Sequence, residues 1–301
     1  MSASAASVRE VREFWNAHPC NSAYSEANER ARYFDDIERA RYEREAHVPE
    51  VARFEMFAGR RVLEIGCGIG IDGLQFVRHG AEYTAIDLSD ASLRLATERF
   101  ELAGARAQFL NGNAEELPFA GGSFDHIFSF GAIHHSPHTE HIVAEMHRVL
   151  RPNGTVCVMI YNRSSINYQF EIKVLRKAFR QALRPRFMPA LLSRLSGFEQ
   201  AKLERHRELL LSRGDLSEEA WLSMNTDGPD CPLARVYDER EARRLFAGFE
   251  DVETYARHFD RSHWPLVGDL LPNSTVRRLG ERWGWHRIVW ARKREHSTVP
   301  A

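Results

Sequence analysis

The stretch that decides the fold is Arg-Val-Leu-Glu-Ile-Gly-Cys-Gly-Ile-Gly-Ile-Asp-Gly, residues 61–73. Its apolar run up to Ile65 predicts a buried strand, and the chain then passes directly into a glycine-rich turn. Because glycine has no Cβ, Gly66 and Gly68 allow the backbone to turn sharply and to approach a ligand closely. The spacing is G-x-G-x-G after Glu64, whereas a dinucleotide-binding fingerprint reads G-x-G-x-x-G. The stretch therefore predicts a ligand-binding turn of another kind.

A second landmark follows the predicted helix over 72–79. The next strand is expected over 81–86 and ends in Asp87, which lies 87 − 66 = 21 residues beyond the first glycine. An acid at the tip of a second strand is placed to accept hydrogen bonds from both ribose hydroxyls of an adenosine ligand. Taken together, residues 62–70 and 85–89 resemble the class I S-adenosylmethionine (SAM) methyltransferases.

Two further segments carry this resemblance. Residues 113–119 with 123–129 are similar to the family's adenine-side loop and fourth strand, and residues 150–155 are similar to the turn into its fifth strand. The family has Asp where this chain has Asn113, so we expect Asn113 or Glu115 to contact the adenine amino group. The resemblance covers residues 55–161. It implies an α/β fold with a Rossmann-like, seven-stranded, doubly wound sheet, and SAM as cofactor. The SAM site is expected to comprise Glu64, Gly66, Gly68, Gly70, Asp87, Leu88, Asn113, Ala114, Phe130 and Tyr33.

Composition indicates the class of partner. The chain has 301 residues, of which 43% are hydrophobic, and a formal net charge of −1. This balance gives no general attraction to nucleic acid or to an anionic membrane, so a small-molecule acceptor is expected. Its four cysteines lack C-x-x-C spacing, which predicts neither a metal site nor disulfide bonds. The first fifteen residues lack the apolar core of a signal peptide, so a cytoplasmic protein is expected, and homo-oligomerisation stays an open alternative.

The chain divides into four parts. Residues 1–54 are expected to form helices over the cofactor mouth, where Trp15, Tyr33 or Phe34 would pack on the methionine end of SAM or anchor the helices to the sheet. Residues 55–161 would form the SAM-binding core, and 162–236 a helical cap inserted over the acceptor pocket. Residues 237–301 would complete the sheet with strands over 252–258 and 286–293.

Three side chains are candidate general bases. His134 and His135 follow the fourth strand, at the carboxyl edge where ligands bind in doubly wound folds, although a pure packing role is the alternative. Glu171 lies within an apolar arc of a helix predicted over 165–183. A carboxylate in such an arc needs a partner or a catalytic role, the alternative being a salt bridge to a basic neighbour. We predict Glu171 and His134 as the catalytic residues.

The segment Tyr161 to Ser165 brings hydroxyls and a guanidinium to the start of that helix, which would suit a phosphate or a carboxylate. With apolar aromatic residues in the cap, this is similar to the isoprenoid-diphosphate C-methyltransferases, and Mg²⁺ is expected only with such an acceptor. The alternatives are O- or N-methylation of another small metabolite, and a SAM-binding sensor or partner subunit without catalysis. Nucleic-acid methylation is not expected, because residues 129–132 lack the Asn/Asp-Pro-Pro-aromatic motif. The expected substrate contacts are Tyr161, Asn162, Arg163, Tyr168 and Trp221.

Overall fold

The fold was obtained as a computed structural model, which describes residues 6–22, 25–196, 200–212, 217–228, 230–261, 264 and 268–295. One mixed sheet organises the chain, with the strand order β3-β2-β1-β4-β5-β8-β7. The parallel strands are β1 (Arg61–Ile65), β2 (Glu82–Asp87), β3 (Gln108–Asn111), β4 (Phe124–Phe130) and β5 (Leu150–Asn162). At the far edge, β8 (His286–Arg292) runs antiparallel to β5 and to β7 (Glu250–Arg257). The predicted Rossmann-like α/β fold is therefore confirmed.

The strand count differs from the seven predicted. A two-residue strand, β6 (Val236–Tyr237), pairs in parallel with the end of β5. Two residues give too short a run for side-chain alternation to be read from sequence. The fifth strand is also longer than expected and includes residues 150–155, which were predicted as a turn. Asn153 adopts a positive φ of 62° within it and so keeps the bend that the sequence indicated.

Helices cover both faces of the sheet. One core cluster takes residues from α3 (Val48–Ala52), α4 (Ile71–Arg78) and α5 (Asp90–Leu102), and the other from α6 (Thr139–Val149) and α11 (Glu239–Leu245). Neighbouring strand residues alternate between the two: Val62 belongs to the first cluster and Leu63 to the second. The helix ends are capped, for example by Ser89 before α5 and by the Asp238 and Glu241 capping box of α11.

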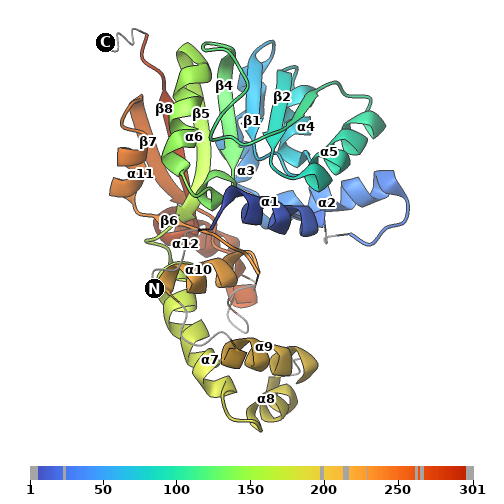
Figure 1. The fold of residues 1–301 in the computed structure, drawn as a ribbon, viewed down its shortest axis with the longest axis vertical. Coiled ribbons are helices and arrows are strands. Elements are labelled where there is room, and N and C mark those ends of the chain that lie inside the picture. Colours follow the sequence, from blue (N-terminus) through green and yellow to red (C-terminus); the bar gives the residue numbers. More distant parts are fainter. Residues whose placement is uncertain are drawn as a thin grey trace.

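Two further helices, α1 (Val8–Ala17) and α2 (Arg30–Arg44), precede α3. A short 3-10 helix, η2 (Phe54–Phe57), leads into β1, and another, η3 (Ile133–His135), follows β4. In Figure 1, α1 lies across the sheet edge at which the parallel strands end. The N-terminal part therefore covers the edge where ligands bind in doubly wound folds.

The connection from β5 to β6 is helical. A π-helix, η4 (Asn167–Leu175), continues into α7 (Arg176–Leu183), and α8 (Met188–Ser196), α9 (Gln200–Ser212) and α10 (Glu218–Thr226) follow. The sequence predicted one α-helix over 165–183, whereas its first half has the wider π geometry. Figure 1 shows α7, α8 and α9 as a lobe that projects from the sheet, with α10 between the lobe and the body. The C-terminal part adds η6 (Gly268–Leu270) and α12 (Asn273–Trp283).

Candidate active site

The glycine turn after β1 has the geometry that its sequence predicts. Gly66 and Gly68 both have positive φ, 73° and 53°. A Cβ on Gly66 would lie 2.1 Å from the Cβ of Ala132, whereas a Cβ on Gly68 would meet no atom within 4 Å. Packing against Ala132 therefore requires a glycine at position 66, whereas the space beside Gly68 leaves its backbone accessible to a ligand. Gly70 is the N-cap residue of α4 and packs near Phe100, so its role is in the fold rather than in the cavity wall.

Asp87 joins this turn to the next helix. One of its carboxylate oxygens accepts a hydrogen bond from the backbone N–H of Gly68, and the other from that of Ser89, both at 2.8 Å. Burial raises the pKa of Asp87 to about 6, against the lowering effect of these two bonds. Each oxygen keeps a second acceptor position, so the carboxylate can still receive two hydroxyls from a ligand.

A cavity of about 320 Å³ opens at this edge of the sheet. It brings most of the predicted SAM residues together with Tyr161, which was predicted as a substrate contact. The wall includes Glu64, Gly66, Gly68, Asp87, Leu88, Asn113, Ala114, Phe130 and Tyr161. Trp15 of α1 also lines it, whereas Tyr33 does not and instead donates its hydroxyl to the carbonyl of Ser22. Glu115 lies in the wall beside Asn113, so both alternatives for the adenine contact stay open.

Buried charges lie at one end of the cavity. Arg41 of α2 reaches Asp72 at 2.8 Å and Glu45 at 2.8 Å, and the hydroxyl of Tyr83 donates to Glu64 at 2.5 Å. Burial, and then the nearby charge of Asp72, hold the pKa of Glu64 well above its usual range. This end of the site therefore offers both a guanidinium and carboxyl groups to a ligand.

The two adjacent histidines lie in different environments. His134 is fully buried against the ring of Tyr161, with ring centroids 3.9 Å apart, and it does not line the cavity. Burial, with the charge of His135 second, holds the pKa of His134 well below its usual range. This arrangement corresponds to the packing role that the sequence left as an alternative.

His135 lines the cavity. Its Nδ1 lies 2.6 Å from the carbonyl oxygen of Leu233, which favours the tautomer with the proton on Nδ1. Its Nε2 lies 3.6 Å from a carboxylate oxygen of Asp227, whose other oxygen accepts the hydroxyl of Tyr161 at 2.9 Å. The Nε2 of His135 and the facing oxygen of Asp227 are both buried and, among the described residues, have no hydrogen-bond donor. A ligand that carries a proton is the kind of group that these two acceptors would receive.

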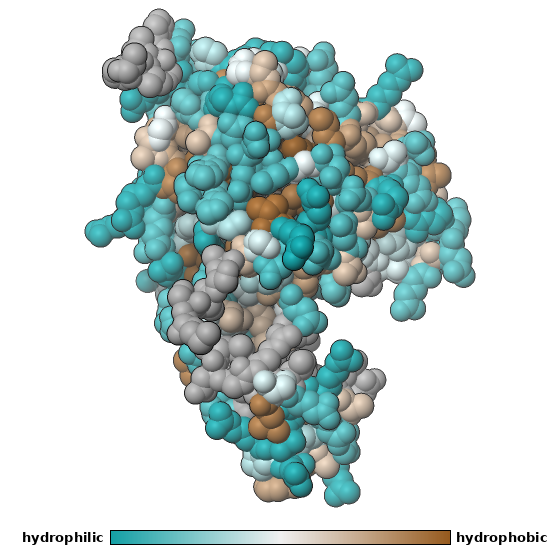
Figure 2. Space-filling model, viewed as in Figure 1, coloured by the Kyte–Doolittle hydropathy of each residue, from teal (hydrophilic) through white to brown (hydrophobic). Residues whose placement is uncertain are grey.

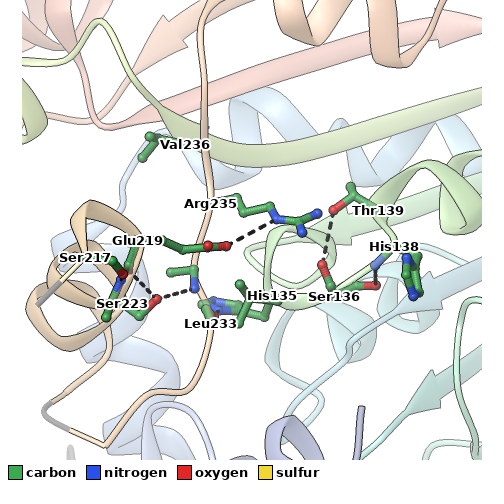
Figure 3. Close-up of polar contacts among 12 residues, drawn as sticks. His135, Ser136, His138, Thr139, Ser217, Glu219, Ser223, Leu233, Arg235 and Val236 are labelled. Carbon is green, nitrogen blue, oxygen red and sulfur yellow. Dashed lines mark hydrogen bonds and ion pairs between the residues drawn. The ribbon is translucent and has the colours of Figure 1, made fainter. Parts of the chain in front are cut away.

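Figure 3 shows how the chain around Leu233 is held beside His135. The hydroxyl of Ser223 in α10 accepts the backbone N–H of Ala234 at 2.7 Å, and Arg235 lies 3.8 Å from Glu219. Helix α10 therefore fixes the position of the carbonyl that orients His135.

Glu171 lies outside the cavity. Its carboxylate accepts a hydrogen bond from Asn167 at 3.0 Å and pairs with Arg176 at 2.5 Å and 2.9 Å. The sequence left open a salt bridge to a basic neighbour, and the structure has that arrangement. Because Arg176 is five residues away, the wider turn of the π-helix brings the two side chains together.

The remaining predicted substrate contacts also lie outside the cavity. Trp221 donates its indole N–H to the carbonyl of Ile172 at 3.0 Å and is buried under the lobe. Asn162 bonds the backbone of Gly284 and the side chain of Arg287. Arg163 and Tyr168 line a separate hollow near α10, where Arg163 pairs with Glu241 at 3.1 Å. Arg163 is thus engaged in an ion pair, and these residues do not form an anion site at the cavity.

Among the residues that the structure describes, two clusters could be considered for a metal. The ligand atoms of Glu45, His47 and His286 lie within 4.8 Å of one another, as do those of His135, Asp227 and Cys231. In the first cluster the two imidazoles are hydrogen-bonded to each other at 2.9 Å, and burial lowers the pKa of His47 to about 2. In the second, burial and then the charge of Asp227 raise the pKa of Cys231 to about 12, which opposes the thiolate that a metal needs. We assign a metal to neither cluster.

Several cavity residues were not among the site residues that the sequence predicted. They are Arg41, Asp227, His258, Trp285 and His286. A turn signal at Asp227-Gly228 was available, and Gly228 does have a positive φ of 119°. Nothing in the sequence, however, shows that this turn returns to the fourth strand.

Comparison with known proteins supports the geometry. Residues 62–154 match the family described as a methyltransferase domain. A phthiotriol/phenolphthiotriol dimycocerosates methyltransferase of Mycobacterium leprae is 41% identical over 99 residues, 32% of this chain and 36% of that protein. The methyltransferase GfsG of Streptomyces halstedii is 34% identical over 109 residues, 35% of this chain and 39% of that protein. The chain thus spans little more than a third of the length of these relatives.

Solved structures show the same fold over nearly the whole chain. The cyclase SpnF has a TM-score of 0.54 and 16% identity, covering 97% of this chain and 98% of that chain. A protein of Pyrococcus horikoshii OT3 has a TM-score of 0.52 and 16% identity, covering 94% and 99%. At this identity the likeness concerns the fold alone.

Proposed function

Because residues 62–154 match a family described as a methyltransferase domain and the chain has a Rossmann-like sheet, we propose that this protein is a SAM-dependent methyltransferase that acts on a small-molecule acceptor. One observation carries the proposal. A single cavity is lined both by the glycine turn with Asp87 and by His135 with Asp227, so cofactor and acceptor sites are continuous.

The cofactor end of the cavity suits SAM. Asp87 would accept the ribose hydroxyls, and Asn113 or Glu115 would contact the adenine. For the methionine portion of SAM, Arg41 suits the carboxylate and Glu64 suits the ammonium group. SAM supplies an activated methyl group when bound, so the protein has to hold the acceptor on the methyl axis and exclude water.

The acceptor end favours one of the alternatives that the sequence left open, O- or N-methylation. Arg163 lies outside the cavity and is paired with Glu241, and Arg41 is assigned in this proposal to the carboxylate of SAM, so neither is left for a diphosphate. The acidic groups Asp227 and Asp260 also line the cavity and would repel an anionic head group. The isoprenoid diphosphate, and with it Mg²⁺, is therefore not part of this proposal.

His135 is proposed as the general base. In the tautomer favoured by Leu233, Nε2 carries a lone pair toward the cavity, and Asp227 lies where it can stabilise the imidazolium. The acceptor oxygen or nitrogen would attack the methyl carbon as the bond from that carbon to sulfur breaks. The proton lost from the acceptor would pass to Nε2 of His135.

The test is incubation of the purified chain with methyl-labelled SAM and a cell extract, followed by mass spectrometry. We expect a labelled small product on oxygen or nitrogen. A purely SAM-binding sensor or partner subunit would show SAM binding by calorimetry and leave no labelled product. A labelled alkene diphosphate would instead restore the carbon-methylation alternative.

A further inference from the structure

Charge is distributed very unevenly along this chain. Residues 163–212 contain 11 Lys and Arg and four Glu, with no Asp, a formal net charge of +7. Since the whole chain carries −1, the rest carries −8. The expectation that no membrane is involved depended on the overall charge of −1. That value is the sum of a basic segment, residues 163–212, and an acidic remainder.

The same segment exposes large apolar side chains. Their exposed fractions are 49% for Val174, 43% for Phe179, 65% for Phe187, 42% for Leu191 and 54% for Leu211. They belong to the lobe formed by η4 and α7–α9, which projects from the sheet in Figure 1. Figure 2 shows apolar surface among hydrophilic residues over this lobe. Several large apolar side chains exposed on one lobe and surrounded by polar residues are typical of an interaction surface.

Basic side chains lie among these apolar residues. Lys177, Arg184, Arg186 and Arg194 are exposed, and none of them has a carboxylate within ion-pair distance among the described residues. Two of them, Arg184 and Arg186, closely precede the exposed Phe187. Within the described residues, the charges of these four side chains are therefore not neutralised by neighbouring acids and are available to an anionic partner.

We propose that the lobe of η4 and α7–α9 docks on an anionic lipid surface. Its phenylalanine, valine and leucine side chains would enter the boundary between headgroups and acyl chains, and its Lys and Arg side chains would contact the anionic headgroups. A nucleic acid would match the charge but would offer no apolar layer to aliphatic side chains. Within the described residues, no helix is long and apolar enough to cross a membrane.

Docking would place the cavity near the lipid. The lobe follows the end of β5, and Tyr161, the second-to-last residue of that strand, lines the cavity. An acceptor held in a bilayer would then reach the site without crossing bulk water. The proposal is independent of the proposed function, because vesicle binding requires neither SAM nor turnover.

Co-sedimentation of the full chain with vesicles tests the proposal. The vesicles are pure phosphatidylcholine, or phosphatidylcholine with about one third phosphatidylglycerol. We expect partitioning at least about tenfold stronger on the anionic vesicles at about 0.05 M salt, and loss of most of this preference at about 0.5 M salt. The double variant Arg184→Glu with Arg186→Glu should lose the preference. Phe187→Ser should weaken binding several-fold while keeping the salt dependence.

The matched control is Arg60→Glu with Arg106→Glu, which changes charge by the same amount at two exposed positions outside the lobe. It should bind anionic vesicles almost as well as the wild type, and thermal melting should confirm that all variants fold. Equal losses in the lobe and control variants would overturn the proposal. Absence of vesicle binding, or self-association that Phe187→Ser abolishes in sedimentation equilibrium, would overturn it as well.

Discussion

SAM affinity should depend on the protonation of Asp87. Its carboxyl group has a pKa raised to about 6 by burial, so near neutral pH it is mostly a carboxylate that can accept two ribose hydroxyls. Ligand binding stabilises the charged form, and affinity is therefore lost as pH falls through 6. At pH 5 only about a tenth of the carboxyl groups would be ionised, so the Kd should rise roughly tenfold between pH 7 and pH 5. Isothermal titration calorimetry at several pH values measures this directly.

Substitution separates Asp87 from other groups that titrate near the cavity. Asp87→Asn keeps the shape of the side chain and cannot ionise, so its SAM affinity should be weaker at pH 7 and nearly independent of pH from 5 to 7. Asp87→Ala removes two charge-assisted hydrogen bonds, about 2–4 kcal/mol, which is roughly a 30- to 900-fold increase in Kd. Unchanged SAM affinity in Asp87→Ala, or an unchanged pH profile in Asp87→Asn, would refute this reasoning.

Three further predictions concern other sites. His135→Gln should lower kcat by about 10² to 10⁴ with SAM affinity near wild type, as measured by steady-state kinetics and calorimetry; normal turnover would exclude it as the base. Glu171→Gln should keep near-normal kcat but lose about 1–3 kcal/mol of stability in urea unfolding, because a buried ion pair is broken; a large loss of kcat would return Glu171 to the catalytic role first predicted. Gly66→Ala should weaken SAM binding by more than about tenfold, because its Cβ would clash with Ala132. Gly59→Ala, also at positive φ but with nothing within 4 Å, is the control and should bind SAM normally.

Local patterns predicted the residues through which β1, β2 and the Asn113 loop line the cavity. The turn after β1, Asp87 at the tip of β2 and the Asn113 loop lie close to one another because parallel strands end at one edge. Each is recognisable from a few consecutive residues, and the topology of the fold then brings them together. For this reason their predicted positions and the cavity wall agree.

The acceptor half depends on contacts between distant segments. His135 meets Leu233, 98 residues later, and Trp285 lies beside Tyr161 with ring centroids 4.3 Å apart. The hydrophobic periodicity of the sequence does not predict these contacts. Glu171 was predicted from an α-helical arc, and the π-helix places it beside Arg176 instead. The π-helical geometry therefore replaces the predicted catalytic role of Glu171 with a structural one, an ion pair with Arg176.

The first helix has a consequence for the rate of turnover. Helix α1 lies over the cavity through Val8, Val11 and Trp15, and it is tied to the start of α5 by bonds from Ser89 to the carbonyl of Trp15 and to Asn16. Ser89 is two residues from Asp87, so the hydrogen bonds that hold α1 and the proposed ribose contact come from one short segment. We expect a ligand that leaves on this side to displace α1 and to break these hydrogen bonds, which form again when α1 returns. We therefore expect the opening of α1, rather than the transfer step, to set the upper limit on how fast spent cofactor is exchanged.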